Sequence, residues 1–305
     1  MLSRVARRVY WMARYIERAE NTARLVNTYH FLLLDLPRGT RVGWDILPVI
    51  TGGYEQFSER YQRHDERNTL KFLLADDSNP ASLIHSIAVA RENCRTSREV
   101  LPGHAWEQLN ELKLFADARI NDALPRRGRF SILTEIIHRC QQLTGLLAGT
   151  MTHDHAYDFI RIGRNLERAD MTSRVVDMGA LSLQGPEDTS GLDLHVWTSM
   201  LKAMNAYQMY RKDVQIGVHC ADVVGFLLQN DYYPRSVAHC LDQAEECLGD
   251  LPLHEDTLKP MREARRRLSR MKPDKLNANT LHAEIDRLQV GFSGIHKKIR
   301  DTWFT

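Results

Sequence analysis

Apolar residues recur at helical spacing along almost the whole chain. In the segment after Pro80, for example, Leu83, Ile87 and Ala90 fall on one face of a helix. Sustained alternation of apolar and polar residues is missing, and so are the Asn-Gly and Asp-Gly turns of β-hairpins. The pattern therefore predicts an all-α fold with ten or more helices. Turn-forming sequences separate the helical stretches at 36–39, 51–53, 78–80, 101–103, 124–128, 184–188 and 271–274.

Two pairs of segments repeat along the chain at an offset of about 150 residues. Residues 14–27, RYIERAENTARLVN, and residues 164–177, RNLERADMTSRVVD, are identical at seven of fourteen positions. Residues 72–87 and 226–241 follow in the same order and are identical at seven of sixteen positions. Matches in the same order at a nearly constant offset indicate a duplicated unit.

Trp44 and Trp197 provide a third match, at an offset of 153 residues. Two copies are too few for a solenoid, in which each of many repeats packs on its neighbours. We therefore expect a single domain at 1–305, built as a helical bundle of two pseudo-symmetric, internally duplicated halves at 1–155 and 156–305.

The two Glu-Arg segments carry matching charged stripes, each within about a third of the helix circumference. Because duplicated halves most simply meet through equivalent surfaces, we expect the two helices to pack beside each other. In the first copy the stripe consists of Arg14, Glu17, Arg18, Asn21 and Arg24. In the second copy it consists of Arg164, Glu167, Arg168 and Arg174, with Met171 in place of Asn21.

Three interpretations of the stripe are open. It is a solvated face with surface ion pairs worth about 0–1 kcal/mol each, or a buried ion-pair network that fixes the packing of the halves. The third is a cationic groove whose arginines bind an anion, while Glu17 and Glu167 orient them or meet a substrate amine. We expect Arg91 and Arg235 to approach the cluster from the second repeated element, with Glu92 as a further counter-charge. The predicted site or network comprises Arg14, Glu17, Arg18, Asn21, Arg24, Arg91, Glu92, Asn93, Arg164, Glu167, Arg168, Asp170, Arg174 and Arg235.

Composition adds limits on location and partners. The chain is 43% hydrophobic and 26% charged, with a formal net charge of +2, so no global attraction to nucleic acid or membrane is expected. Its five cysteines form no Cys-x-x-Cys motif, which favours a reducing cytoplasm. No apolar stretch approaches the roughly 20 residues of a membrane span. The Arg-rich opening continues into residues 14–27, so we interpret it as the start of a structural helix rather than a targeting peptide.

Several motifs resemble those of one known family. The sequences YWMARYIERAENTAR, ARENCRTSREVL, WEQLNEL, FIRIGRNLERADMTSRVVD and YYPRSVAHCL are similar to the alpha-E superfamily, a bacterial all-helical family named for its ER motif. The resemblance extends from Met1 to about residue 250. The chain departs from the family pattern at Cys94, where alanine is usual, and in Asp231-Tyr232-Tyr233, which precede the Pro-Arg-Ser segment.

The resemblance implies a partner more directly than a reaction. Alpha-E proteins occur beside, or fused to, a circularly permuted ATP-grasp ligase, often near a transglutaminase-like protease. This context implies the helical partner subunit of an amide or peptide ligase system, which binds or orients an acidic or peptidic substrate. ATP and Mg are expected on the ligase, and we expect this chain to bind no cofactor. It contains neither a Gly-x-x-x-x-Gly-Lys-Ser/Thr loop nor a Gly-rich strand-to-helix turn.

A metal-dependent oxidoreductase of helical-bundle type is an alternative function. Glu135 and His138 match the Glu-x-x-His element of di-iron bundles, but the repeat offset places Ile285 where a second glutamate is needed. We therefore expect no metal site. A second group of ligand-type residues is interpreted instead as a capped polar helix start, and it consists of His153, Asp154, His155 and Asp158.

A basic helix is expected at 261–272. Such a helix is usually a solvated surface element, but clustered arginines also contact phosphates. The second alternative is therefore an RNA-binding adaptor that delivers an aminoacyl group. No Gly-x-Ser-x-Gly elbow or Cys/His pairing indicates a nucleophile, so whether the chain is itself an enzyme stays open. The basic residues are Arg262, Arg265, Arg266, Arg267 and Arg270.

Overall fold

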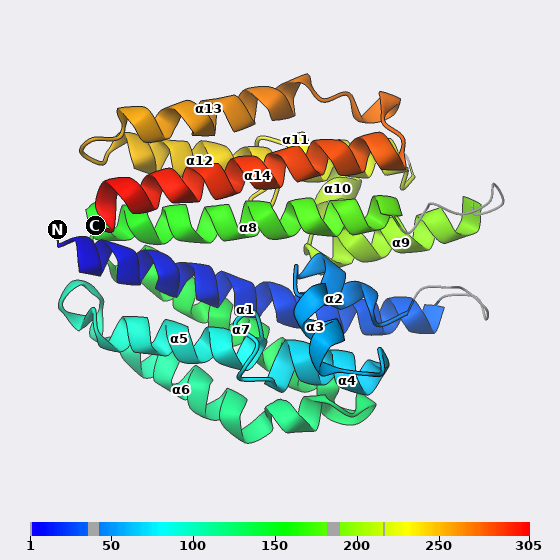
Figure 1. The fold of residues 1–305 in the computed structure, drawn as a ribbon, viewed down its shortest axis with the longest axis horizontal. Coiled ribbons are helices and arrows are strands. Elements are labelled where there is room, and N and C mark those ends of the chain that lie inside the picture. The colour runs from blue at the N-terminus through cyan, green and yellow to red at the C-terminus, as the bar shows by residue number, and fades with distance from the viewer. Residues whose placement is uncertain (1, 36–42, 182–189, 216) are drawn as a thin grey trace.

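The computed structural model describes residues 2–35, 43–181, 190–215 and 217–305 (Figure 1). Within these ranges the chain forms α-helices and a few short π and 3-10 turns but no strand, which confirms the all-α prediction. The turn sequences expected at 36–39 and 184–188 lie outside the described residues. The helices are α1 (Ser3–Asp35), α2 (Ile46–Ile50), α3 (Tyr54–Arg60), α4 (Glu66–Leu70), α5 (Leu83–Arg95), α6 (Gly103–Arg119), α7 (Arg126–Thr150), α8 (His155–Leu181), α9 (Ser190–Ala203), α10 (Tyr207–Asp213), α11 (Cys220–Gln229), α12 (Val237–Gly249), α13 (Glu255–Arg270) and α14 (Ala278–Trp303).

The two long Glu-Arg helices, α1 and α8, lie side by side at the centre of the bundle (Figure 1). Helices α5, α6 and α7 pack on the α1 side, and α12, α13 and α14 pack on the α8 side. The contact between α1 and α8 is close at Gly163, where an added Cβ would lie 2.4 Å from the carbonyl oxygen of Tyr10. Glycine at this position therefore lets the two backbones approach.

In both halves, the helix of the second repeated element begins in the same way. Ser82 caps α5 by accepting a hydrogen bond from the backbone N–H of His85 at 3.2 Å. Ser236 caps α12 by accepting one from the N–H of His239 at 3.1 Å. A serine hydroxyl in this place satisfies one of the orphan N–H groups at a helix start. The Pro-x-Ser sequence before each helix thus fixes where it begins.

The turns after α2 and α9 also share a backbone pattern, at an offset of 153 residues. Gly53 N–H donates to Pro48 O at 2.8 Å, and Ala206 N–H donates to Leu201 O at 2.7 Å. The residues before them, Gly52 and Asn205, both adopt positive φ, at 71° and 57°. The two halves are therefore alike in these local details, while their origin by duplication, with a boundary near residue 155, stays a prediction.

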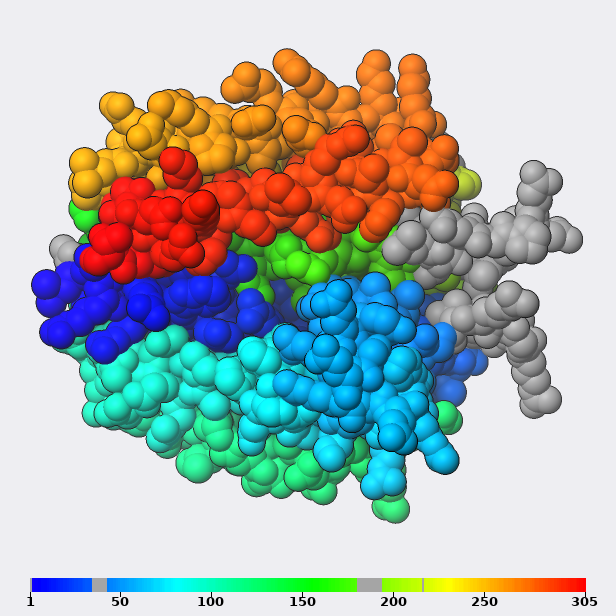
Figure 2. Space-filling model, viewed as in Figure 1, coloured from blue at the N-terminus to red at the C-terminus, as the bar shows by residue number. Residues whose placement is uncertain are grey.

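A groove runs along one face of the bundle, with α8 at its floor between α1, α2 and α14 (Figure 2). The surrounding core is continuous and includes fully buried Tyr10, Trp197 and Tyr210. None of the described helices combines the length and the apolar composition that a bilayer span requires.

Candidate functional site

Reciprocal ion pairs join the two central helices. Arg18 donates to Glu167 from Nε to Oε1 at 2.5 Å and from Nη2 to Oε2 at 3.1 Å. Arg168 donates in the same way to Glu17, at 2.9 Å from Nε to Oε1 and at 2.8 Å from Nη2 to Oε2. Both pairs are bidentate, the strongest geometry for an arginine and a carboxylate. The prediction that the Glu-Arg helices pack beside each other is confirmed.

The two carboxylates are buried, since Glu17 is 2% and Glu167 is 3% exposed. The interpretation of the stripe as a solvated surface face is therefore wrong. It fails because the two stripes face each other across the contact between α1 and α8, where each carboxylate pairs with an arginine of the other helix. A network of this kind fixes the geometry between the helices even where desolvation cancels much of its attraction.

The second arginine at each carboxylate comes from a different place. Arg14 donates to Glu167 Oε2 at 2.7 Å, whereas Glu17 Oε1 accepts from Nη1 of Arg235 at 2.9 Å. The counterpart of Arg14 is Arg164, whose buried Nε has no hydrogen-bond partner within the described ranges. Burial and the neighbouring Arg168 lower the pKa of Arg164. The two halves of the network are thus not equivalent in their bonding.

Arg235 joins the network from the second repeated element, as the sequence predicts. It donates to Glu20 Oε1 at 2.5 Å and to Asn21 Oδ1 at 2.8 Å, in addition to Glu17. Arg24 also donates to Glu20, at 2.8 Å. Four polar side chains of α1 and two arginines of the second half, Arg168 and Arg235, therefore form one connected cluster.

Both central glutamates stay ionised far below neutral pH. Burial alone would raise the pKa of Glu17, but Arg168 and Arg235 outweigh it and lower the pKa to about 2. Burial likewise opposes ionisation of Glu167, and Arg18 and Arg14 lower its pKa to about 2. Both carboxylates are therefore charged at neutral pH.

The depressed pKa values predict acid sensitivity. Each carboxylate stabilises the folded state above its ordinary pKa of about 4.5, and this stabilisation is lost as the pH falls toward the folded value of about 2. We expect the free energy of unfolding to fall by about 2 kcal/mol per carboxylate between pH 6 and pH 3. Urea unfolding followed by circular dichroism at several pH values measures this. An unfolding free energy that does not change over this range contradicts the prediction.

Three predicted site residues lie away from the network, so their placement in it is wrong. Arg91 donates from Nε to Asn110 Oδ1 at 2.8 Å and lies over the ring of Trp106, because its face of α5 is turned toward α6. Glu92 is 55% exposed at its side chain and pairs with Arg95 on the surface. Asn93 lines a separate surface groove beside Arg4, Arg8 and Trp11.

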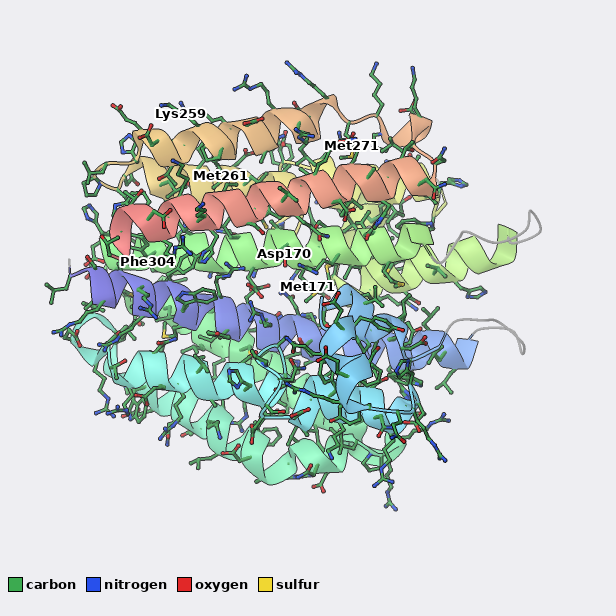
Figure 3. The ribbon with its side chains drawn as sticks, in the orientation of Figure 1. Asp170, Met171, Lys259, Met261, Met271 and Phe304 are labelled. Carbon is green, nitrogen blue, oxygen red and sulfur yellow. The ribbon has the colours of Figure 1, made fainter. Side chains whose placement is uncertain are left out.

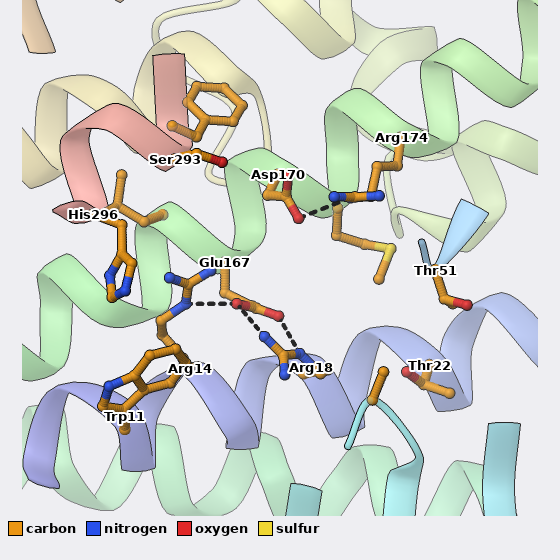
Figure 4. Close-up of a pocket in the computed structure, with 14 residues that line it drawn as sticks. Trp11, Arg14, Arg18, Thr22, Thr51, Glu167, Asp170, Arg174, Ser293 and His296 are labelled. Carbon is orange, nitrogen blue, oxygen red and sulfur yellow. Dashed lines mark hydrogen bonds and ion pairs between the residues drawn. The ribbon is translucent and has the colours of Figure 1, made fainter. Parts of the chain in front are cut away.

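A cavity of about 380 Å³ opens beside Glu167, between α1, α2, α8 and α14 (Figure 4). Arg174 lies on its wall and donates from Nε to Asp170 Oδ2 at 2.9 Å. Gly52, with φ +71°, makes room for this arginine, because a Cβ there would lie 2.8 Å from its Nη1. The lining residues are Trp11, Arg14, Arg18, Thr22, Thr51, Ala81, Leu166, Glu167, Asp170, Met171, Arg174, Phe292, Ser293 and His296.

The cavity has apolar walls and carries both signs of charge. Arg14, Arg18 and Arg174 face Glu167 and Asp170, an excess of one positive charge. His296 adds no charge at neutral pH, because burial and then Arg14 lower its pKa to about 4. A zwitterionic or carboxylate-bearing ligand of small size matches this arrangement.

The sequence does not single out several residues of the cavity wall. Thr51 follows α2, Ala81 precedes α5 and His296 lies on α14, and none of them belongs to the charged stripe. Ala81 and Thr51 lie within or near the repeated segments, so comparison of the two halves position by position could have found them. No motif or repeat in the sequence marks His296 as a residue of the cavity wall.

The residues considered as metal ligands have other roles. Glu135 accepts from Arg139 Nε at 2.7 Å, and His138 lines a small cavity beside Arg24. Asp154 caps α8, accepting from the N–H of Ala156 at 2.9 Å, which confirms the capped helix start. Across the described part of the chain, no three His, Cys, Asp or Glu side chains are grouped to hold a metal ion.

The basic helix α13 lies on the outside of the bundle, and long side chains extend outward from it (Figure 3). Two of its arginines are paired, Arg262 with Glu245 at 2.7 Å and Arg265 with Asp242 at 2.7 Å. The remaining arginines of the predicted RNA-binding set, Arg266, Arg267 and Arg270, line a shallow basic concavity. The solvated surface helix expected from the sequence is confirmed, and RNA binding stays a prediction.

Comparison with known proteins identifies the family to which the chain belongs. Residues 1–304 match the model of the Alpha-E family, described as "a predicted alpha-helical domain with a conserved ER motif". The chain is 25% identical over 322 residues to uncharacterised proteins of Mycobacterium bovis and of two strains of Mycobacterium tuberculosis. Each alignment covers 98% of this chain but 36% of the relative, so the chain spans about a third of the length of these curated relatives. No solved structure matches the chain significantly.

Proposed function

Because the chain belongs to the Alpha-E family, we propose that it is the helical partner subunit of an ATP-grasp-type ligase that forms amide or peptide bonds. In this proposal the ligase binds ATP and Mg, and this chain binds or orients an acidic or peptidic substrate. The cavity between α1, α2, α8 and α14 is the proposed substrate site.

The observation that carries the proposal is that the arginines at the cavity differ in how far their donors are already bonded within the protein. Arg14 and Arg18 are both committed to Glu167, whereas Arg174 bonds only one Asp170 oxygen through Nε and lies 28% exposed at the wall. The fork of Arg174 therefore faces the opening with donors for an incoming carboxylate. A substrate carboxylate bound there would be held on a rigid helix, as positioning for bond formation requires.

Co-expression tests the partner role directly. The chain is produced together with the circularly permuted ATP-grasp protein encoded beside it, and the mixture is separated by size exclusion. ATP hydrolysis by the complex is then screened over amino acids and short peptides. We expect co-elution and hydrolysis that depends on one substrate class. Two proteins that elute separately and a ligase whose hydrolysis ignores this chain would refute the proposal.

Replacing Arg174 with methionine tests the substrate site. We expect substrate-dependent ATP hydrolysis at low substrate concentration to fall by about 10- to 100-fold, since a charge-assisted hydrogen bond is lost. The melting temperature should change little, because the Arg174–Asp170 pair is partly exposed and contributes at most about 1 kcal/mol.

The matched control is Arg139→Met. Arg139 pairs with Glu135 at the same helical spacing and is 29% exposed, but it does not line the cavity. We expect this variant to hydrolyse ATP as the unmodified complex does. Equal activity of the two variants would remove Arg174 from the substrate site.

A further inference from the structure

Ala81 and Arg235 occupy equivalent places in the two halves. Each follows a proline and precedes the serine that caps α5 or α12. The first histidine of each helix also repeats its bond, from His85 Nδ1 to Asp77 O at 3.0 Å and from His239 Nδ1 to Asp231 O at 2.8 Å. The loops that carry Ala81 and Arg235 therefore have the same pattern of hydrogen bonds.

On one side of the α1–α8 contact, the closed side, two large side chains fill this region. Arg235 places its guanidinium between Glu17, Glu20 and Asn21. Thr172 donates from Oγ1 to the carbonyl oxygen of Arg235 at 2.8 Å and lies 3.5 Å from the sulfur of Met204. The guanidinium of Arg235 and the hydroxyl of Thr172 are therefore both bonded, while Nδ2 of Asn21 has no partner among the described residues.

On the other side, the open side, the same positions carry small residues. Ala81 occupies the position equivalent to Arg235, and Thr51 occupies the position equivalent to Met204. Thr22, the counterpart of Thr172, is 1% exposed, and its hydroxyl has no hydrogen-bond partner among the residues that the structure describes. All three residues line the 380 Å³ cavity.

The carboxylates that hold the guanidinium are present on both sides. Glu167 and Asp170 correspond to Glu17 and Glu20, and both line the cavity together with Ala81. The cavity is therefore the space that an arginine side chain fills on the closed side, with its two acidic partners kept in place.

We propose that the open side binds the guanidinium group of a ligand, in the place that Arg235 occupies on the closed side. The inference rests on the proposed function and names its substrate class: arginine, or a peptide with an arginine residue at the bound end. The guanidinium lies against Glu167 and Asp170, and the ligand's carboxylate faces the fork of Arg174. Thr22 offers its unused hydroxyl to the same ligand.

The charges permit this assignment. The closed side holds Arg24, Arg168 and Arg235 around Glu17 and Glu20, and Arg164 lies close enough to Glu17 to help lower its pKa, so four guanidinium groups surround two buried carboxylates there. The open side holds three, Arg14, Arg18 and Arg174, and a ligand guanidinium makes the same number. A ligand guanidinium raises the excess on the open side from one positive charge to two, and a carboxylate on the same ligand lowers it by one. A zwitterionic arginine ligand therefore suits the cavity better than a simple amine.

Calorimetric titration with L-arginine and L-citrulline tests the proposal on the whole chain. The two amino acids have nearly the same shape, but citrulline carries no charge on its side chain. We expect arginine to bind at least about tenfold more tightly, because the lost contacts are charge-assisted hydrogen bonds. Equal affinity for the two amino acids, or no binding of arginine, overturns the proposal.

The variant Ala81→Arg gives the second arm. Its side chain supplies the missing guanidinium from the protein itself, so we expect arginine binding to be lost and the melting temperature to stay the same or rise. Arginine binding that is unchanged in a folded Ala81→Arg protein overturns the proposal. If this variant fails to fold, Asp170→Asn replaces it, with an expected loss in affinity of about tenfold.

The outcome is separable from that of the proposed function. A ligase complex whose substrates depend on Arg174 but show no preference for arginine refutes the guanidinium site and leaves the partner role standing. If Ala81→Arg abolishes arginine binding but the chain never associates with an ATP-grasp ligase, the guanidinium site stands and the partner role is refuted.

Discussion

Replacing Glu17 with methionine is expected to lower the free energy of unfolding by about 3–5 kcal/mol, the usual effect of removing one partner from a buried ion pair. Glu17 is the shared acceptor of Arg168 and Arg235, and all three side chains are at most 13% exposed. Without the carboxylate, two guanidinium groups lie close together in a largely buried region. Urea unfolding followed by the helical circular dichroism signal measures the loss.

The control for this variant is Glu92→Met. Glu92 also forms a bidentate pair, with Arg95, but both side chains are more than half exposed. An exposed pair of this kind contributes about 0–1 kcal/mol, so the control should unfold nearly as the unmodified chain does. A loss below about 1 kcal/mol in Glu17→Met would show that the network is not structural.

The helices and their central pairing are predictable from the sequence for a simple reason. Apolar spacing marks each helix, and the serines after Pro80 and Pro234 mark where two of them begin. Arg18 and Glu167 repeat Arg168 and Glu17 at a constant offset, so pairing the two helices satisfies all four charges at once. A pattern that repeats between distant segments carries information about their contact.

The cavity is harder to predict, because small residues create it. Ala81 is an ordinary residue in a loop, and it matters only because Arg235 fills the equivalent space in the other half. Arg91 and Glu92, in contrast, carry charge and resemble site residues, but they find Asn110 and Arg95 as nearer partners. Residue type therefore indicates which groups can bind a ligand, while tertiary packing decides which of them are left with an opening beside them.

The network also explains why a binding site can lie at the central helix contact of the bundle. Glu167 keeps Arg14 and Arg18 as partners whether or not the cavity is filled, so the empty site leaves no carboxylate uncompensated. Arg164, the counterpart of Arg14, has no such bond at its Nε, because Arg235 takes part of the closed-side carboxylate. On the open side Arg14 thus makes the bond to the carboxylate that Arg235 makes on the closed side.

Replacing Arg235 with alanine should turn the closed side into a second opening. The variant removes the bonds to Glu17, Glu20 and Asn21 and leaves two buried carboxylates with fewer donors, so we expect the free energy of unfolding to fall by about 3–5 kcal/mol. Added agmatine, whose guanidinium sits on a short aliphatic chain, should restore part of the loss. A concentration tenfold above its dissociation constant corresponds to about 1.4 kcal/mol.

Melting temperatures of the Arg235→Ala and unmodified chains, measured with agmatine and with sodium chloride at equal ionic strength, separate specific rescue from a salt effect. The double variant Ala81→Arg, Arg235→Ala extends the comparison, because it fills the open side and empties the closed one. We expect agmatine to stabilise this double variant through the closed side alone, by the same amount as it restores there in Arg235→Ala. If agmatine shifts the unmodified, single-variant and double-variant chains no more than salt does, then Glu17 and Glu20 do not hold a free guanidinium, and the argument that assigns one to Glu167 and Asp170 loses its support.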